Sequence, residues 1–272
     1  MLYKIITTLV LLFFGVCTAA FPHDEGLSAA ERYLTAYPDF FVAYEDGCLR
    51  TVTGEKFVLD DLIDKNYDRM IVDTAAGDES FDPQDAFCWE YGSGEPIPTE
   101  ENPPIGDPGR IRPAVIFNYM YGAPGTDRGK DMRKVRWVGS AGGKPRTVAV
   151  TTVNGVDKAL ERVAREIMDL PDEKMQSLKG VVFDVAGPYG YFDRPVRDYP
   201  NRTSGHAYGI AVDINGNLSY FIGSQRDEPY CYRNNVPGFI VDIFEKNGFI
   251  WGGRWNSYDA MHFEYRPELL LK

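Results

Sequence analysis

Histidine is rare in this chain of 272 residues, and two of its three copies lie in motifs that could hold a metal ion. His206 belongs to Ser-Gly-His-Ala-Tyr-Gly-Ile-Ala-Val-Asp, which ends at Asp213, and His262 belongs to Asp-Ala-Met-His-Phe-Glu. Asp213 falls within an apolar run, where a buried carboxylate is costly unless it is paired or binds a cation. Two imidazoles and one carboxylate leave the fourth position of a catalytic zinc ion to water. We therefore expect one zinc ion here, although this ligand set does not fix the metal uniquely.

Asp259 is the candidate general base. It precedes His262 by three residues, so the two side chains share a site only if the chain turns between them, and Asn256-Ser257-Tyr258 favours a turn. The carboxylate would then lie beside the attacking water without ligating the metal. In the strand expected at 261–265, His262 and Glu264 share the polar face, so Glu264 is the next candidate base.

Arg194, in Tyr-Phe-Asp-Arg-Pro, is the candidate for stabilising the negative charge that develops on the substrate carbonyl. Arg197 and Arg202 compete for this role, and any of the three could instead be a solvated surface charge.

Other interpretations of these motifs have less support. Ser204 and His206 are too close in sequence for the usual Ser-His-Asp arrangement, and the chain has no Gly-x-Ser-x-Gly sequence. The absence of His-Glu-x-x-His excludes a zinc site of that helical type. Taken singly, a histidine is more often structural, an aspartate is often a turn residue, and Trp-Gly-Gly could be a tight corner. Together, these interpretations would need both motifs to arise by coincidence.

The two motifs together resemble those of the VanY and D-alanyl-D-alanine carboxypeptidase family of zinc peptidases, most closely the branch with phage L-alanyl-D-glutamate endopeptidases. The clear resemblance covers about residues 180–267, and a looser one extends to Asp-Pro-Gly-Arg-Ile-Arg at 107–112 and to residues 154–157. Ser204 and Trp255 are expected to contact the substrate. The other roles that the resemblance implies are zinc ligation by His206, Asp213 and His262, base catalysis by Asp259 and carbonyl binding by Arg194.

The sequence departs from the family pattern in two places, 196–202 and 221–236, which should affect the groove more than the mechanism. Strands and helices alternate without a strict βαβ order, which favours an α+β fold. The resemblance implies a central, mostly antiparallel sheet flanked by helices, as in Hedgehog domains and D-Ala-D-Ala peptidases. Apolar patterns predict strands at 135–138, 146–152, 181–185, 210–214, 249–251 and 261–265, and helices at 156–170 and 237–246.

The N-terminal part should be organised differently. A capping box at Ser28 and Glu31 predicts a helix start, and residues 40–59 predict a small meander. Residues 93–109, rich in Gly and Pro, predict a linker or long loop. We therefore expect a signal peptide at 1–20, an N-terminal region of unknown role at 21–105 and a catalytic domain at 106–272.

Residues 1–20 have the pattern of a secretory signal: Lys4, an apolar stretch and a small-residue cleavage site. An uncleaved anchor and a lipoprotein at Cys17 are the alternatives, and nothing else in the chain predicts a membrane span. Three cysteines remain after cleavage, with Cys48 and Cys88 the expected disulfide and Cys231 left over. The net charge of -11 argues against nucleic-acid binding and against adhesion to anionic lipid.

These observations predict an exported zinc peptidase, periplasmic or secreted, that hydrolyses peptidoglycan stem peptides by direct attack of water. D-Ala-D-Ala carboxypeptidase and L-Ala-D-Glu endopeptidase activities both remain open, with a slight preference for the second from the resemblance. The alternative is a catalytically silent, zinc-bearing wall-binding protein, because Hedgehog domains resemble this peptidase fold. The presence of Asp259 together with every ligand favours the enzyme.

Overall fold

The computed structural model describes residues 26–72, 76–126, 131–138, 146–178, 190–193, 195–196, 199–214, 220 and 230–272. Helices and short antiparallel strands alternate in these segments, so the fold is α+β as predicted. The described strands form four small sheets, ordered β1-β2-β3, β8-β10-β9, β4-β5 and β6-β7, and no larger sheet appears among them. The predicted signal peptide, the strand at 181–185 and residues 194 and 197 lie outside the described residues.

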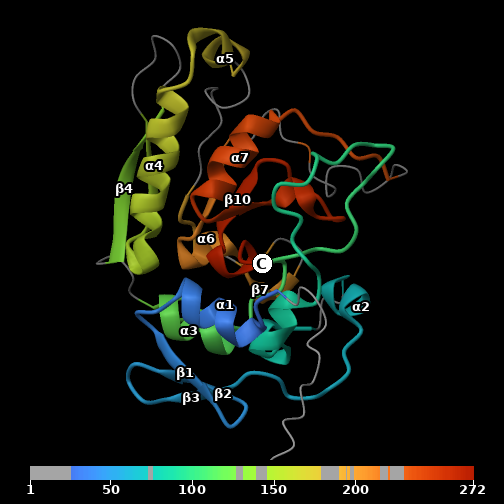
Figure 1. Ribbon diagram of the computed structural model, residues 1–272, viewed down its shortest axis with the longest axis vertical. Helices are drawn as coiled ribbons and strands as arrows, with labels where there is room; N and C mark the ends of the chain where they lie inside the picture. Colours follow the sequence, from blue (N-terminus) through green and yellow to red (C-terminus); the bar gives the residue numbers. More distant parts are fainter. Residues whose placement is uncertain are drawn as a thin grey trace, which may run out of the picture.

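The N-terminal part contains the helix and the meander that the sequence predicts. Helix α1 (Ala29–Ala36) starts with the capping box, in which the Ser28 hydroxyl accepts from the Glu31 amide and the Glu31 carboxylate accepts from the Ser28 amide. In Figure 1, α1 lies beside α3, with the meander below them. The other elements of this part are β1 (Phe41–Glu45), β2 (Cys48–Thr51), β3 (Lys56–Val58), α2 (Tyr67–Val72), η1 (Asp78–Ser80), η2 (Pro83–Phe87) and α3 (Ala114–Tyr121).

The next part of the chain packs a hairpin against two amphipathic helices. Strands β4 (Met132–Trp137) and β5 (Arg146–Thr151) pair, and α4 (Val156–Met168) covers them and contacts α7 (Gly238–Lys246) (Figure 1). The apolar residues at helical spacing within α4 are buried, Leu170 lies beyond its end, and Pro237 directly precedes α7. Shorter elements here are α5 (Asp172–Ser177), β6 (Pro195–Val196), β7 (Tyr199–Thr203) and α6 (Gly205–Tyr208).

The sheet of β8 (Ala211–Asp213), β10 (His262–Tyr265) and β9 (Phe249–Trp251) carries the motif residues. His262 pairs with Asp213 across β10 and β8. Phe263 turns toward the core, where its ring stacks on Phe244 with 3.8 Å between centroids. His262 and Glu264 therefore lie on the opposite face, as the alternation predicts.

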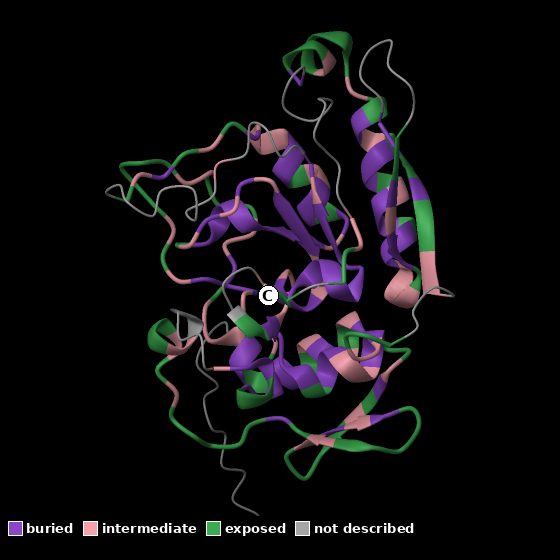
Figure 2. Ribbon diagram, turned by 180° about the vertical axis from the view of Figure 1, so that it is seen from behind, coloured by how far each residue is buried: buried purple, intermediate pink, exposed green. Residues whose placement is uncertain are grey.

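One apolar core spans both sides of the predicted boundary at residue 105. It includes Tyr33 from α1, Phe117 from α3 and Phe263 from β10, and Figure 2 shows buried residues running through both halves. The loop at 93–109 is tied down, because Arg254 donates to the carbonyl of Glu95. The boundary itself stays a prediction.

Cys48, Cys88 and Cys231 are free thiols, so the expected disulfide between Cys48 and Cys88 is wrong. The two residues lie in elements that do not pair, because Cys48 begins β2 and Cys88 follows η2. No helix among the described residues combines the length and the apolar character needed to cross a bilayer.

Candidate metal centre

The structure brings His206, Asp213 and His262 together, and we call these three residues the histidine cluster. The Oδ1 atom of Asp213 lies 3.1 Å from Nε2 of His206 and 3.0 Å from Nδ1 of His262. The three potential ligand atoms lie within 4.8 Å of one another. The spacing suits three ligands around one small cation, as the sequence predicts.

Local structure explains how His206 reaches this position. The hydroxyl of Ser204 caps α6 by accepting from the amide of His206, at 3.3 Å. Gly209 ends the helix with φ 73°, a conformation that favours glycine, and the chain then enters β8. Gly205 is required by packing, because a Cβ there would lie 2.5 Å from Oε2 of Glu264.

In each imidazole, the ring nitrogen that faces away from Asp213 lies next to a hydrogen-bond acceptor. Nδ1 of His206 lies 2.8 Å from the carbonyl oxygen of Gly190, which can only accept, so Nδ1 donates and Nε2 is free to ligate. Nε2 of His262 lies 3.2 Å from Oε2 of Glu264, so Nδ1 faces Asp213. Metal-binding histidines usually have this support. The donor set and its orientation therefore fit a zinc ion.

A buried ladder of charges supports Glu264. Arg112 donates from Nε and Nη2 to its two carboxylate oxygens, at 2.8 and 2.5 Å. Nη1 of Arg266 lies 3.4 Å from Glu264, and Arg266 also forms an ion pair with Glu268. Glu268 in turn accepts a hydrogen bond from the hydroxyl of Tyr37, the residue that follows α1. Tyr37, from the predicted N-terminal region, thus joins a series of contacts that ends at His262, and a single sequence gives no signal for pairs so far apart.

The electrostatics of the cluster favour positive charge near Asp213. Burial would raise the pKa of Asp213, but the charges and hydrogen bonds of His206 and His262 outweigh it and hold the pKa well below its usual range. Burial would lower the pKa of His262, but hydrogen bonds to Asp213 and Glu264 raise it to about 9. The negative charge of Asp213 that favours a proton on His262 would also attract a metal cation.

Asp259 lies beside the cluster on the turn that the sequence predicts. Its amide donates to the carbonyl of Gly252, and its own carbonyl accepts from the amide of His262 at 3.1 Å. Its Oδ1 atom is buried and has no hydrogen-bond partner within the described part of the chain. Burial and the charge of Asp213 raise the pKa of Asp259. A carboxylate with an open acceptor atom can take up a proton.

Residues 198–265 match the family model described as D-alanyl-D-alanine carboxypeptidase. We call this stretch, which is about a quarter of the chain, the carboxypeptidase-family segment. The resemblance noted from the motifs is thereby confirmed, and the match covers the histidine cluster and Asp259. It does not distinguish the branches of the family. No curated protein and no solved structure matches the chain.

Two further residues assigned within the carboxypeptidase-family segment are buried. Ser204 is 7% exposed and caps α6, and Trp255 is 1% exposed with its ring 5.3 Å from that of His262. This geometry favours positioning of the ligands over contact with a substrate. Arg202 is also buried and donates to the carbonyl of Arg110 at 2.5 Å. Arg194 and Arg197 lie outside the described residues.

Sequence reasoning assigned no role to Arg110, which precedes the carboxypeptidase-family segment. The segment 107–112 that contains it was the only signal, through its looser resemblance to the family. The guanidinium lies over the indole of Trp255, with its Cζ 4.0 Å from the ring centroid, and Nη2 donates to the carbonyl of Ser257 at 2.6 Å. Arg110 therefore borders the turn that carries Asp259.

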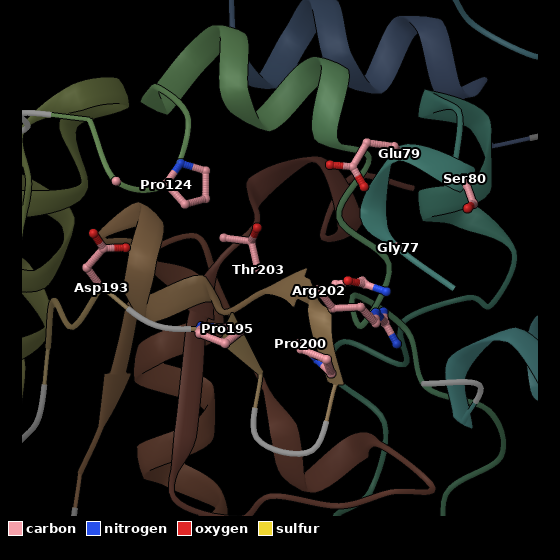
Figure 3. Close-up of a pocket in the computed structure, with 11 residues that line it drawn as sticks. Gly77, Glu79, Ser80, Pro124, Asp193, Pro195, Pro200, Arg202 and Thr203 are labelled. Atoms are coloured by element: carbon pink, nitrogen blue, oxygen red, sulfur yellow. The ribbon is translucent and has the colours of Figure 1, made fainter. Parts of the chain in front are cut away.

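A pocket of about 720 Å³ adjoins the start of the carboxypeptidase-family segment. Figure 3 shows Thr203 near its centre, with Glu79 and Asp193 on opposite sides. Thr203 directly precedes Ser204, the N-cap residue of α6. The charged residues of the lining are Glu79, Asp193 and Arg202, so the pocket has both signs of charge.

Proposed function

We propose that the chain is an exported zinc peptidase that hydrolyses peptidoglycan stem peptides. One observation supports it most strongly: Nε2 of His206, Oδ1 of Asp213 and Nδ1 of His262 converge, with both imidazoles oriented by acceptors. This convergence lies inside the segment that matches the carboxypeptidase family. The proposal extends from that family's peptidase activity to zinc dependence and to wall peptides as the substrate.

Asp259 would move the protons of the reaction. A bound zinc ion would lower the pKa of a water molecule to roughly 7 and polarise the peptide carbonyl. The open Oδ1 of Asp259 accepts a proton from the attacking water and later returns it to the leaving amine. Arg194 is proposed to lie near the carbonyl oxygen, where a cation stabilises the developing charge.

The surrounding elements would keep this geometry fixed. Ser204 holds the start of α6, Trp255 packs against His262, and Glu264 fixes the ring of His262 from behind. We further propose that the sheet β8-β10-β9 is the counterpart of the central sheet in Hedgehog-like peptidases. Export rests on the signal sequence, which would bring the enzyme to the wall.

The test combines metal analysis with digestion of defined muropeptides and mass analysis of the products. We expect about one zinc ion per chain and either a cut between L-Ala and D-Glu or release of D-Ala, with casein left uncut. Protein without metal, or activity that survives chelators, would contradict the zinc proposal. Zinc binding with no cleavage of any muropeptide would instead support the silent binding protein.

A further inference from the structure

Arg110 is a half-buried arginine that forms no ion pair with a carboxylate among the described residues, although the charges of Asp107 and Asp259 act on it. Its neighbours Arg112 and Arg202 face Glu264 and Asp78, whereas the side chain of Arg110 donates, within the described part of the chain, to the carbonyl of Ser257. Its Nε atom is buried and has no hydrogen-bond partner among the described residues. A charge removed from water is costly unless it is paired and hydrogen-bonded. The arrangement of Arg110 would therefore be completed by an anion that comes from outside the chain.

The position of Arg110 relates it to the site of proton transfer. The ring of Trp255 lies 4.0 Å from Cζ of Arg110 and 5.3 Å from the ring of His262, measured at its centroid. Ser257, which accepts from Nη2, lies two residues before Asp259 on the same turn. The charge of Arg110 also acts on Asp259 directly. An anion bound to Arg110 would thus lie near the atom that protonates the leaving amine.

The two candidate substrates share an anion at that place. In a D-Ala-D-Ala end, the leaving nitrogen is attached to a carbon that carries the terminal carboxylate. In an L-Ala-D-Glu bond whose D-Glu continues through its γ-carboxyl group, the leaving nitrogen is attached to a carbon that carries a free α-carboxylate. A base within hydrogen-bond reach of this nitrogen lies close to that carboxylate in both cases.

We propose that Arg110 binds the carboxylate next to the leaving nitrogen and makes the enzyme specific for substrates that carry it. The inference rests on the proposed function and adds the chemical group that is recognised. The planar guanidinium suits this role, because its fork of donors matches a carboxylate with two parallel hydrogen bonds. Trp255 holds the fork in place, so little side-chain freedom is lost when the substrate binds.

The test compares paired substrates that differ only in this group: stem peptides with a free α-carboxylate on D-Glu or with its carboxamide, and peptides ending in D-Ala or in D-alaninamide. We expect the wild type to prefer the acid by about 10- to 100-fold in kcat/KM, the range for a hydrogen bond to a charged group. Arg110→Met should lose this preference mainly through a higher KM for the acid, and Arg110→Lys should retain part of it.

Arg254→Met is the matched control. Arg254 is another buried arginine, one residue before Trp255, but it pairs with Glu245 and donates to the carbonyl of Glu95. This variant should keep the preference for the acid even if its stability falls. Calorimetric binding of the cleavage product, as acid and as amide, gives a readout that is independent of turnover.

The outcomes separate the two proposals. Wild-type protein that cleaves neither member of a pair contradicts the proposed function. Equal cleavage of acid and amide by the wild type contradicts the role of Arg110 and leaves the peptidase intact. Equal loss on both substrates in a folded Arg110→Met variant assigns Arg110 to packing only. If Arg110→Met does not fold, Arg110→Lys decides, because an unchanged preference there would also overturn the inference.

Discussion

Two regions of the molecule bring three potential metal ligands together, and they differ in what surrounds the ligands. In each region the ligand atoms lie within 4.8 Å of one another. One is the histidine cluster, and the other, which we call the acidic cluster, lies between the meander and η2. The acidic cluster consists of Asp60, Asp61 and Asp82.

The acidic cluster already has a cation. The Nζ atom of Lys65 lies 2.8 Å from carboxylate oxygens of Asp61, Asp82 and Asp85. Asp213 has no such partner, since its ion pairs among the described residues are to the two histidines. Proximity of ligands therefore does not define a metal site. The histidine cluster differs because residues outside it, Gly190 and Glu264, orient its two imidazoles. No lysine or arginine among the described residues neutralises Asp213, so its negative charge can attract a metal ion.

The largest expected effect separates the two clusters directly. His262→Ala should lose both bound zinc and turnover, because it removes a ligand from the histidine cluster. Asp61→Ala, which removes a carboxylate from the acidic cluster, should keep one zinc ion per chain. Elemental analysis and a muropeptide assay measure both. Equal zinc contents in the two variants would show that the comparison is wrong.

A second variant separates zinc binding from chemistry within the same region. Asp259→Ala should retain zinc and lose about 100- to 10,000-fold in kcat, the usual contribution of a positioned general base. Steady-state kinetics on a muropeptide would check this, with zinc content as the control. Normal turnover in this variant would show that Asp259 is only a turn residue, and Glu264 would become the candidate general base.

The third prediction concerns Glu264, which orients the imidazole of His262. Glu264→Gln should weaken zinc binding by about 10- to 100-fold, the usual effect of changing a group that holds a ligand. Glu268→Gln, one step further along the same ladder, should lower stability without changing zinc affinity. Competition with a chelator measures affinity, and thermal denaturation measures stability. Equal zinc affinities in both variants would contradict the role of Glu264.

The smallest effect tests the acidic cluster. Lys65→Met leaves its carboxylates facing one another, so the melting temperature should fall by about 2–4 °C. Millimolar Ca²⁺, which prefers oxygen ligands, should restore part of this in the variant and not in the wild type. Differential scanning calorimetry with and without Ca²⁺ measures both melting temperatures. If Ca²⁺ does not raise the melting temperature of the variant, the carboxylates of the acidic cluster are not arranged to bind a cation even without Lys65.

The same contrast explains what the sequence could predict. The histidine cluster comes from two local motifs, and the alternation in β10 gives the faces of His262 and Glu264. Helices α4 and α7 have clear periodicity and clear ends. Helix α3 was missed because it is apolar on nearly every side and shows no period. The pairing of Arg112 with Glu264 joins residues 152 apart, and no local pattern indicates it.

The contact between Tyr37 and Glu268 also has a consequence for how the protein folds. It joins residues 231 apart in sequence, at the outer end of the ladder that leads to His262. Loop-closure entropy opposes contacts of such separation, so they form late on the way to the native state. A chain emerging from the ribosome must release its C-terminal strand before the ladder can close. We therefore expect the support behind His262 to be among the last parts of the histidine cluster to form.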